Sequence, residues 1–83
     1  MTQRSPAKSR TLYLGGLPST ISLESLRDLL ERFGPLEDVR LLPRREAAIA
    51  YVTFAAESAA LEARRALDGT RLADHRLRVE FAS

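Results

Sequence analysis

The sequence predicts an α+β fold in which a four-stranded antiparallel sheet carries two helices on one face. Apolar residues repeat with strand or helix periodicity along the chain in the order β-α-β-β-α-β. This order is typical of the split β-α-β arrangement, which places both helices on the same side of the sheet. With 83 residues and 45% apolar composition, the chain can form one small domain. It has no cysteine, so a disulfide framework and a thiolate metal site are both excluded.

The first half of the chain predicts a strand and a helix behind a basic lead-in. Residues 1–10 have no apolar period and are expected to be a flexible basic N-terminal segment, which leaves residues 11–83 as the domain. Residues 11–15 are expected to form the first strand, and residues 16–20 a loop because of their Gly and Pro content. Ser22 is the predicted N-cap of a helix that ends at Gly34-Pro35. The residues of its apolar stripe are Leu23, Leu26, Leu29, Leu30 and Phe33.

The second half predicts two strands, a helix and a last strand. Residues 36–42 and 47–54 alternate as strands around a short turn, and residues 76–82 alternate as the fourth strand after a connector at 70–75. Between them, residues 55–67 are alanine-rich and predict a helix with Arg64 and Arg65 exposed. The residues expected on the sheet-facing side of this helix are Ala59, Ala60, Ala63, Ala66 and Leu67.

The strand at residues 47–54 has two different faces. Alternation places Ala50, Val52 and Phe54 on the buried side, and Tyr51 on the opposite side between two β-branched residues. The first strand repeats this arrangement, because Tyr13 is flanked by two leucines. Two tyrosines on one sheet face predict a binding platform suited to flat rings.

These two segments resemble the two signature motifs of the RNA recognition motif family. Leu12-Tyr13-Leu14-Gly15-Gly16-Leu17 is similar to the shorter motif, and residues 47–54 are similar to the longer one, so the resemblance covers residues 11–82. It implies a ferredoxin-like fold and binding of single-stranded RNA by base stacking on the sheet. The longer motif is partial: Ala47 stands in place of a basic residue, Ala48 in place of glycine and Ile49 in place of an aromatic residue. The resemblance therefore implies weakened affinity.

The expected RNA-binding residues all lie on the sheet face or in the turn beside it. Stacking is assigned to the two tyrosines, apolar contact to two aliphatic side chains, phosphate contact to arginines, and acceptance from a base amino group to one glutamate. Each has a plainer interpretation, since exposed strand residues, solvated turn tips and exposed ion pairs are common. The candidate residues are Tyr13, Tyr51, Ile49, Leu42, Arg40, Arg44, Arg45, Arg78 and Glu80.

Two shorter resemblances concern the subtype within the family. Residues 33–45 are similar to the polypyrimidine-tract-binding and hnRNP L type, whose longer motif is also degenerate. Residues 77–82 instead resemble the last strand of the paraspeckle splicing-factor family, so the subtype stays open. The family resemblance implies a nuclear protein that acts in RNA processing such as splicing.

Other functional classes find little support in the sequence. His75 lies beside Asp74 in a connector without a catalytic partner, and no nucleophile accompanies a base, so we expect no enzyme. Acylphosphatases share the topology but need an arginine in the loop after the first strand, and metallochaperones of that topology need paired cysteines. No apolar run approaches the ~20 residues that span a bilayer, and no signal peptide is evident, so we expect an intracellular protein without a membrane partner. We also expect no metal and no small-molecule cofactor.

The main alternative is a protein-interaction module of the same fold, with weak or no RNA binding. Arg4, Lys8 and Arg10 lie in the first ten residues, which leaves ten basic against eleven acidic side chains in the rest of the chain. Such a body does not attract polyanions in general. Other proteins are then the expected partners, bound through the helix face or the sheet, whereas single-stranded RNA is the partner that the two tyrosines favour.

Overall fold

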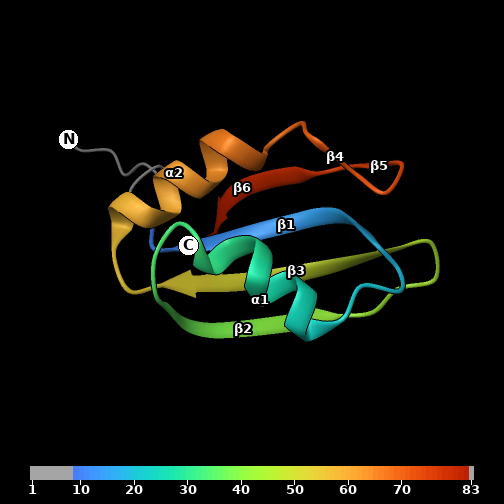
Figure 1. The fold of residues 1–83 in the computed structure, drawn as a ribbon, viewed down its shortest axis with the longest axis horizontal. Coiled ribbons are helices and arrows are strands. Elements are labelled where there is room, and N and C mark those ends of the chain that lie inside the picture. The colour runs from blue at the N-terminus through green and yellow to red at the C-terminus, as the bar shows by residue number, and fades with distance from the viewer. Residues whose placement is uncertain (1–8, 83) are drawn as a thin grey trace.

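The computed structural model describes residues 9–82, which form a four-stranded antiparallel sheet in the order β2-β3-β1-β6, with a small separate hairpin. Both helices cover the same face of the sheet (Figure 1). The predicted β-α-β-β-α-β arrangement and the ferredoxin-like fold class are thereby confirmed. The elements are β1 (Thr11–Pro18), α1 (Leu23–Glu31), β2 (Leu36–Leu42), β3 (Ala47–Phe54), α2 (Glu57–Leu67), β4 (Arg71–Leu72), β5 (His75–Arg76) and β6 (Arg78–Ala82).

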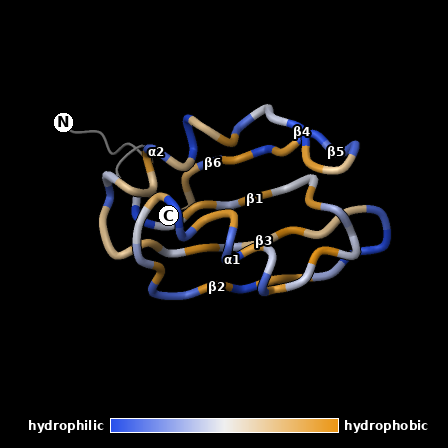
Figure 2. The backbone as a smooth tube through the Cα atoms, in the orientation of Figure 1, coloured by the Kyte–Doolittle hydropathy of each residue, from blue (hydrophilic) through white to orange (hydrophobic). Residues whose placement is uncertain are grey.

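The core lies between the sheet and the two helices. Alternate residues of the central strands, Leu12 and Leu14 of β1 and Ala50 and Val52 of β3, are fully buried there, as the alternation predicts. Figure 2 shows the corresponding change between apolar and polar residues along the strands. Because a slip of one residue would turn these side chains to solvent, burial fixes the register of the strands.

Helix α1 begins where the sequence predicts. The Oγ of Ser22 accepts a hydrogen bond from the backbone N–H of Ser25 at 3.0 Å, which satisfies one of the free N–H groups of the first turn. Leu26 and Leu30 are fully buried against the sheet. Leu23, however, is 46% exposed and was wrongly expected in the stripe. It lies at the edge of the stripe in the first turn of the helix, where fewer neighbouring residues cover it.

Strand β1 runs three residues further than predicted. The loop expected at residues 16–20 is wrong for its first part, because the strand continues to Pro18 through a bulge between Leu14 and Leu17. Gly16 occupies the bulge with φ of +75°, a conformation that costs glycine little. The extra residue shifts the alternation by one, so that Leu17 rejoins Leu14 on the buried face.

Helix α2 begins at Glu57 rather than residue 55, because Ala56 has extended backbone angles. Small buried side chains, Ala60 and Ala63 among them, let this helix approach the sheet closely. Ala66 is exposed at the edge of the stripe, contrary to expectation. Arg64 was expected to be exposed and is half-buried, because its guanidinium lies 5.4 Å from the centre of the Phe81 ring in a cation–π contact.

The segment predicted as connector and fourth strand is divided into a hairpin and a shorter strand. Ala73 and Asp74 both have positive φ and form the tip of the β4–β5 hairpin. Leu77 leaves the sheet ladder and exchanges backbone hydrogen bonds with Gly69 and Thr70. Arg76 therefore belongs to the hairpin, and the edge strand of the main sheet begins at Arg78.

The two described residues that precede β1 are attached to the domain. The carbonyl of Arg10 accepts the backbone N–H of Phe54 at 2.8 Å, and its guanidinium donates to Glu37 at 2.9 Å. Ser9 donates through its hydroxyl to the carbonyl of Ala82. The flexible segment expected over residues 1–10 thus does not include Ser9 and Arg10, and its remainder lies outside the described residues. Neither helix within residues 9–82 is long and apolar enough to cross a membrane.

Two glycines with similar φ angles allow a test of the close approach at the bulge. A Cβ added to Gly16 would collide with the carbonyl oxygen of Arg76, whereas a Cβ on Gly69, at φ of +83°, would have no atom within 4 Å. We expect Gly69→Ala to lower the free energy of unfolding by about 1 kcal/mol from backbone strain alone. Gly16→Ala adds the collision and should cost at least about 1 kcal/mol more. Urea denaturation measures both, and equal losses would show that the bulge does not need this approach.

Candidate functional site

One row of four side chains crosses the sheet on the face away from the helices. Strand register places Arg40 of β2 opposite Tyr51 of β3, Tyr51 opposite Tyr13 of β1, and Tyr13 opposite Glu80 of β6. Residues directly opposite each other in an antiparallel ladder face the same side, about 4.5–5.5 Å apart at Cβ. The structure therefore brings together four of the residues predicted for RNA binding.

The two tyrosine rings are in contact at the middle of this row. Their centroids lie 5.6 Å apart with an angle of 58° between the ring planes, a tilted arrangement typical of aromatic pairs. Tyr51 is 38% exposed, and Tyr13 is half-buried. The ring of Tyr13 extends along β1 over Gly15, where an added Cβ would lie 2.6 Å from its hydroxyl oxygen. The glycine thus provides the space in which this ring lies against the backbone.

The rows on either side differ in character. In one neighbouring row Ile49 lies opposite Leu42, and both present apolar surface beside Tyr51 as predicted. In the other neighbouring row the hydroxyl oxygens of Thr11 and Thr53 are 2.9 Å apart. The tyrosines therefore have an apolar border toward the β2–β3 turn and a hydroxyl border on the opposite side. We use the term platform for Tyr13, Tyr51, Ile49, Leu42 and these two threonines.

An ion pair lies along each outer strand of the platform. On β6 the Nε of Arg78 is 2.9 Å from Oε2 of Glu80, and on β2 the Nε of Arg40 is 3.4 Å from an Oδ atom of Asp38. Each pair joins residues two positions apart on one strand. Exposed pairs of this kind contribute about 0–1 kcal/mol, so both guanidiniums, each 74% exposed, stay accessible to a ligand. Asp38 was not predicted as a residue of this site, although alternation along residues 36–42 places it on the same face as Arg40.

Arg44 and Arg45 lie apart from the tyrosine row. They are exposed in the turn between β2 and β3, beyond Ala47, and neither forms an ion pair with another residue of the described part of the chain. Their distance from Tyr51 along β3 suits contact with a chain that extends past the platform rather than with a base stacked on it.

An open hollow of about 540 Å³ adjoins Tyr13 at the junction of β1 and β6. The two glycines of the bulge, Gly15 and Gly16, line it together with Arg76 and Arg78. Asp68, which also lines it, is held by accepting the backbone N–H of Val79 at 2.9 Å. Arg76 was not among the predicted RNA-binding residues, and the unpredicted β4–β5 hairpin, rather than the fourth strand of the sheet, holds it beside the bulge.

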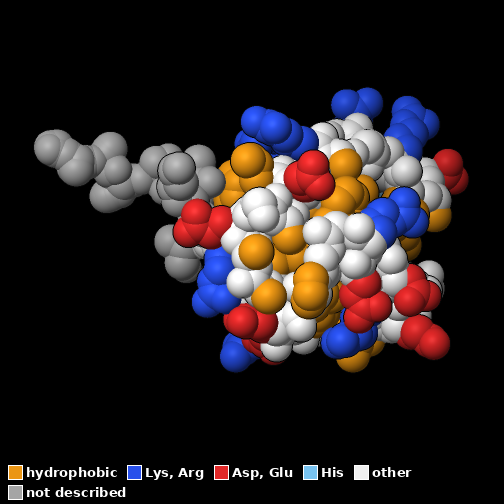
Figure 3. Space-filling model, turned by 60° about the vertical axis from the view of Figure 1, so that its left-hand side comes forward, with side chains coloured by type: hydrophobic (Ala, Val, Ile, Leu, Met, Phe, Trp, Pro, Cys, Tyr) orange, Lys and Arg blue, Asp and Glu red, His pale blue; other side chains and the backbone are white. Residues whose placement is uncertain are grey.

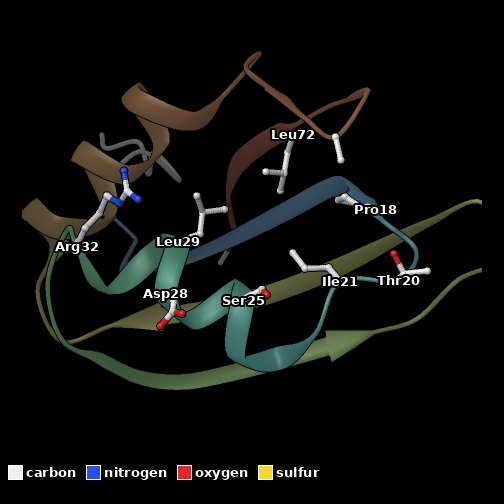
Figure 4. A pocket seen from close by; sticks show the side chains of 9 residues that line it. Pro18, Thr20, Ile21, Ser25, Asp28, Leu29, Arg32 and Leu72 are labelled. Atoms are coloured by element: carbon white, nitrogen blue, oxygen red, sulfur yellow. The ribbon is translucent and has the colours of Figure 1, made fainter.

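A second hollow, of about 460 Å³, lies on the helix side of the protein. Figure 4 shows Leu29 of α1, Ile21 and Leu72 around it, so its lining comes from α1, the loop before it and the β4–β5 hairpin. Asp28 and Arg32 lie at its border. In the view of Figure 3, basic side chains lie along the upper edge and several acidic ones at the lower right, while both signs occur together on the left. This hollow is where the predicted alternative, a protein partner on the helix face, would have a recess.

Comparison with known proteins identifies relatives of this arrangement. A family model described as RNA recognition motif matches residues 12–78. RNA-binding protein 1 of Drosophila melanogaster is 38% identical over 72 residues, which cover 87% of this chain and 49% of the fly protein. Serine/arginine-rich splicing factor SR34B of Arabidopsis thaliana is 37% identical over 79 residues, covering 94% of this chain and 28% of the plant protein. The chain thus spans less than half the length of these curated relatives.

A solved structure agrees with the sequence comparison. The Rna15 RRM with bound RNA (GU) superimposes with a TM-score of 0.81 and 26% identity, covering 90% of this chain and 84% of that one. These relatives support the family resemblance found in the two motifs. They do not distinguish between the polypyrimidine-tract-binding and paraspeckle subtypes, which stay predictions.

Proposed function

The chain belongs to the RNA recognition motif family, and from that premise we propose that it binds single-stranded RNA by stacking bases on Tyr13 and Tyr51. The observation that carries this proposal is the pair of accessible rings, 5.6 Å apart, on the sheet face opposite the helices. Two of the relatives are named as splicing factors or RNA-binding proteins, which supports a role in RNA processing in the nucleus. The chemistry is binding rather than catalysis.

Each group on the sheet then has a physical role. A base stacked on an aromatic side chain gains about 1–3 kcal/mol without dependence on its identity, so each tyrosine holds one base. Ile49 and Leu42 offer apolar contact to a sugar or a base edge. Arg40 and Arg78 reach phosphates from the two outer strands, while Arg44 and Arg45 meet the backbone where it leaves the platform.

The same features set a modest affinity. Two stacking residues in place of three remove up to about 3 kcal/mol, and every 1.4 kcal/mol is about tenfold in Kd. Asp38 and Glu80 also compete with phosphates for the guanidiniums of Arg40 and Arg78 on the outer strands. We propose micromolar or weaker binding by this domain alone. The degenerate longer motif resembles the polypyrimidine-tract-binding and hnRNP L type, whereas residues 77–82 resemble the paraspeckle splicing-factor family.

The second candidate function is protein binding on the helix side. The hollow of about 460 Å³ beside α1 favours it, because Ile21, Leu29 and Leu72 give it an apolar lining. A partner bound there would leave the sheet face free. Substitutions on the sheet therefore separate the two functions.

Removing the rings should abolish most RNA binding without unfolding the protein. We expect about tenfold weaker binding of a labelled random-sequence RNA for Tyr13→Ala or Tyr51→Ala, and about a hundredfold for the double variant, since each loses one stack. Fluorescence anisotropy at fixed salt measures Kd, and thermal unfolding checks the fold. Leu23→Ala is a matched control, because Leu23 is also an exposed large apolar residue but lies on α1. Equal binding by the wild type and the double variant would rule out stacking.

The salt dependence tests the phosphate contacts. Each phosphate that a cation neutralises on single-stranded RNA contributes about 0.7 to the slope of log affinity against log salt. We expect Arg78→Gln to reduce this slope by up to about 0.7. Arg27→Gln is the control, because Arg27 forms an exposed pair with Glu31 on α1 and faces away from the platform. A slope unchanged in Arg78→Gln, or lowered equally in both variants, would exclude a specific phosphate contact at Arg78.

A further inference from the structure

The two tyrosines of the platform have neighbours of opposite charge. Tyr51 is flanked across the strands by Arg40, whereas Tyr13 is flanked by Glu80. We propose that Glu80 selects the base stacked on Tyr13, and that it favours bases with an exocyclic amino group, such as cytosine and adenine, over uracil, which has none. This inference rests on the proposed RNA binding and adds a base preference to it.

Position places Glu80 within reach of such a base. Glu80 is directly opposite Tyr13 in the ladder, and the Tyr13 ring extends toward Gly15, which is itself opposite Arg78. A base on this ring therefore lies over the part of the sheet bounded by the Arg78–Glu80 ion pair. Because β6 is an edge strand of the four-stranded sheet, that pair borders the platform on this side.

The carboxylate of Glu80 is free to accept a hydrogen bond from a bound base. Arg78 donates its Nε–H to Oε2 of Glu80, and no other residue within 9–82 hydrogen-bonds to this carboxylate. The side chain is 52% exposed, so Oε1 is accessible. An ionised carboxylate only accepts hydrogen bonds, and a charge-assisted bond to an amino group is stronger than a neutral one.

Uracil presents the opposite chemistry. Where cytosine has an amino group, uracil has a carbonyl oxygen, and its N–H lies between two carbonyls. A carboxylate repels these oxygens, so uracil on Tyr13 either loses the contact or turns away from it. The carboxylate on the other outer strand, that of Asp38, is not beside a stacking ring, because Asp38 lies opposite Thr53. Asp38 thus neutralises Arg40 but has no stacked base to read.

The experiment compares short oligo(C), oligo(A) and oligo(U) against the wild type, Glu80→Gln and Asp38→Asn by fluorescence anisotropy. For the wild type we expect oligo(C) and oligo(A) to bind about tenfold more tightly than oligo(U). In Glu80→Gln the amide can also donate to uracil, so the ratio should fall below about threefold, chiefly through tighter oligo(U) binding. Asp38→Asn releases Arg40 from its ion pair, just as Glu80→Gln releases Arg78, and it removes the same charge. It should therefore change the affinities for all three oligomers by the same factor.

The outcomes separate the inference from the proposed function. If binding depends on Tyr13 but the base ratio is unchanged in Glu80→Gln, RNA binding stands and the selection by Glu80 is wrong. A ratio that falls equally in Asp38→Asn overturns the inference as well, because net charge would then explain it. If the wild type binds none of the three oligomers, the proposed function fails and the inference with it. Both substitutions are nearly isosteric at exposed positions, and thermal unfolding verifies that the fold is kept.

Discussion

The antiparallel pairing of β1 with β3 is the constraint on which the rest of the molecule depends. These strands occupy the centre of the sheet, and the buried side chains that alternate along them fix their register. The same register places Tyr13 directly opposite Tyr51 on the other face. The same strand register therefore determines both the burial of the core and the position of the rings. A slip by one residue would bury the tyrosines and expose Leu12 and Leu14. The bulge at Gly16 preserves this arrangement, because it returns Leu17 to the core after the strand has passed the platform.

The strand register determines the shape of the platform, and the charged residues around it alter the electrostatic properties of that surface. Both outer strands carry an acid and an arginine two residues apart, so neither edge is simply basic. Exposed pairs add little stability. Their consequence lies in binding, where they lower the general attraction for phosphate and give the two tyrosines different neighbours. The weak net charge and the different charges at the two edges are thus consistent with each other. In this account, stacking provides most of the affinity for RNA, and the charged borders provide the preference for particular bases.

Much of this arrangement follows from local patterns. The alternation around Tyr51 and the cap at Ser22 are properties of a few neighbouring residues, and the structure agrees with both. What the sequence did not predict depends on contacts between distant segments. The continuation of β1 brings Gly16 close to the carbonyl of Arg76, and the half-buried Arg64 lies against the Phe81 ring from another strand. The ion pairs of Arg40 and Arg78 also depend on rotamers that no periodicity specifies. The candidate tyrosines were therefore accessible from sequence, whereas the hollow beside Tyr13 was not.

Chemical-shift mapping with a short single-stranded RNA tests the central claim most directly, because it reports on both faces of the sheet at once. If bases stack on the platform, the largest changes on titration should fall on β1 and β3 around Tyr13, Ile49 and Tyr51, with smaller ones on β6. Residues around the helix-side hollow, such as Leu29 and Leu72, should keep their shifts. Changes confined to α1 and the β4–β5 hairpin, with the two tyrosines unaffected, would contradict RNA binding on the sheet.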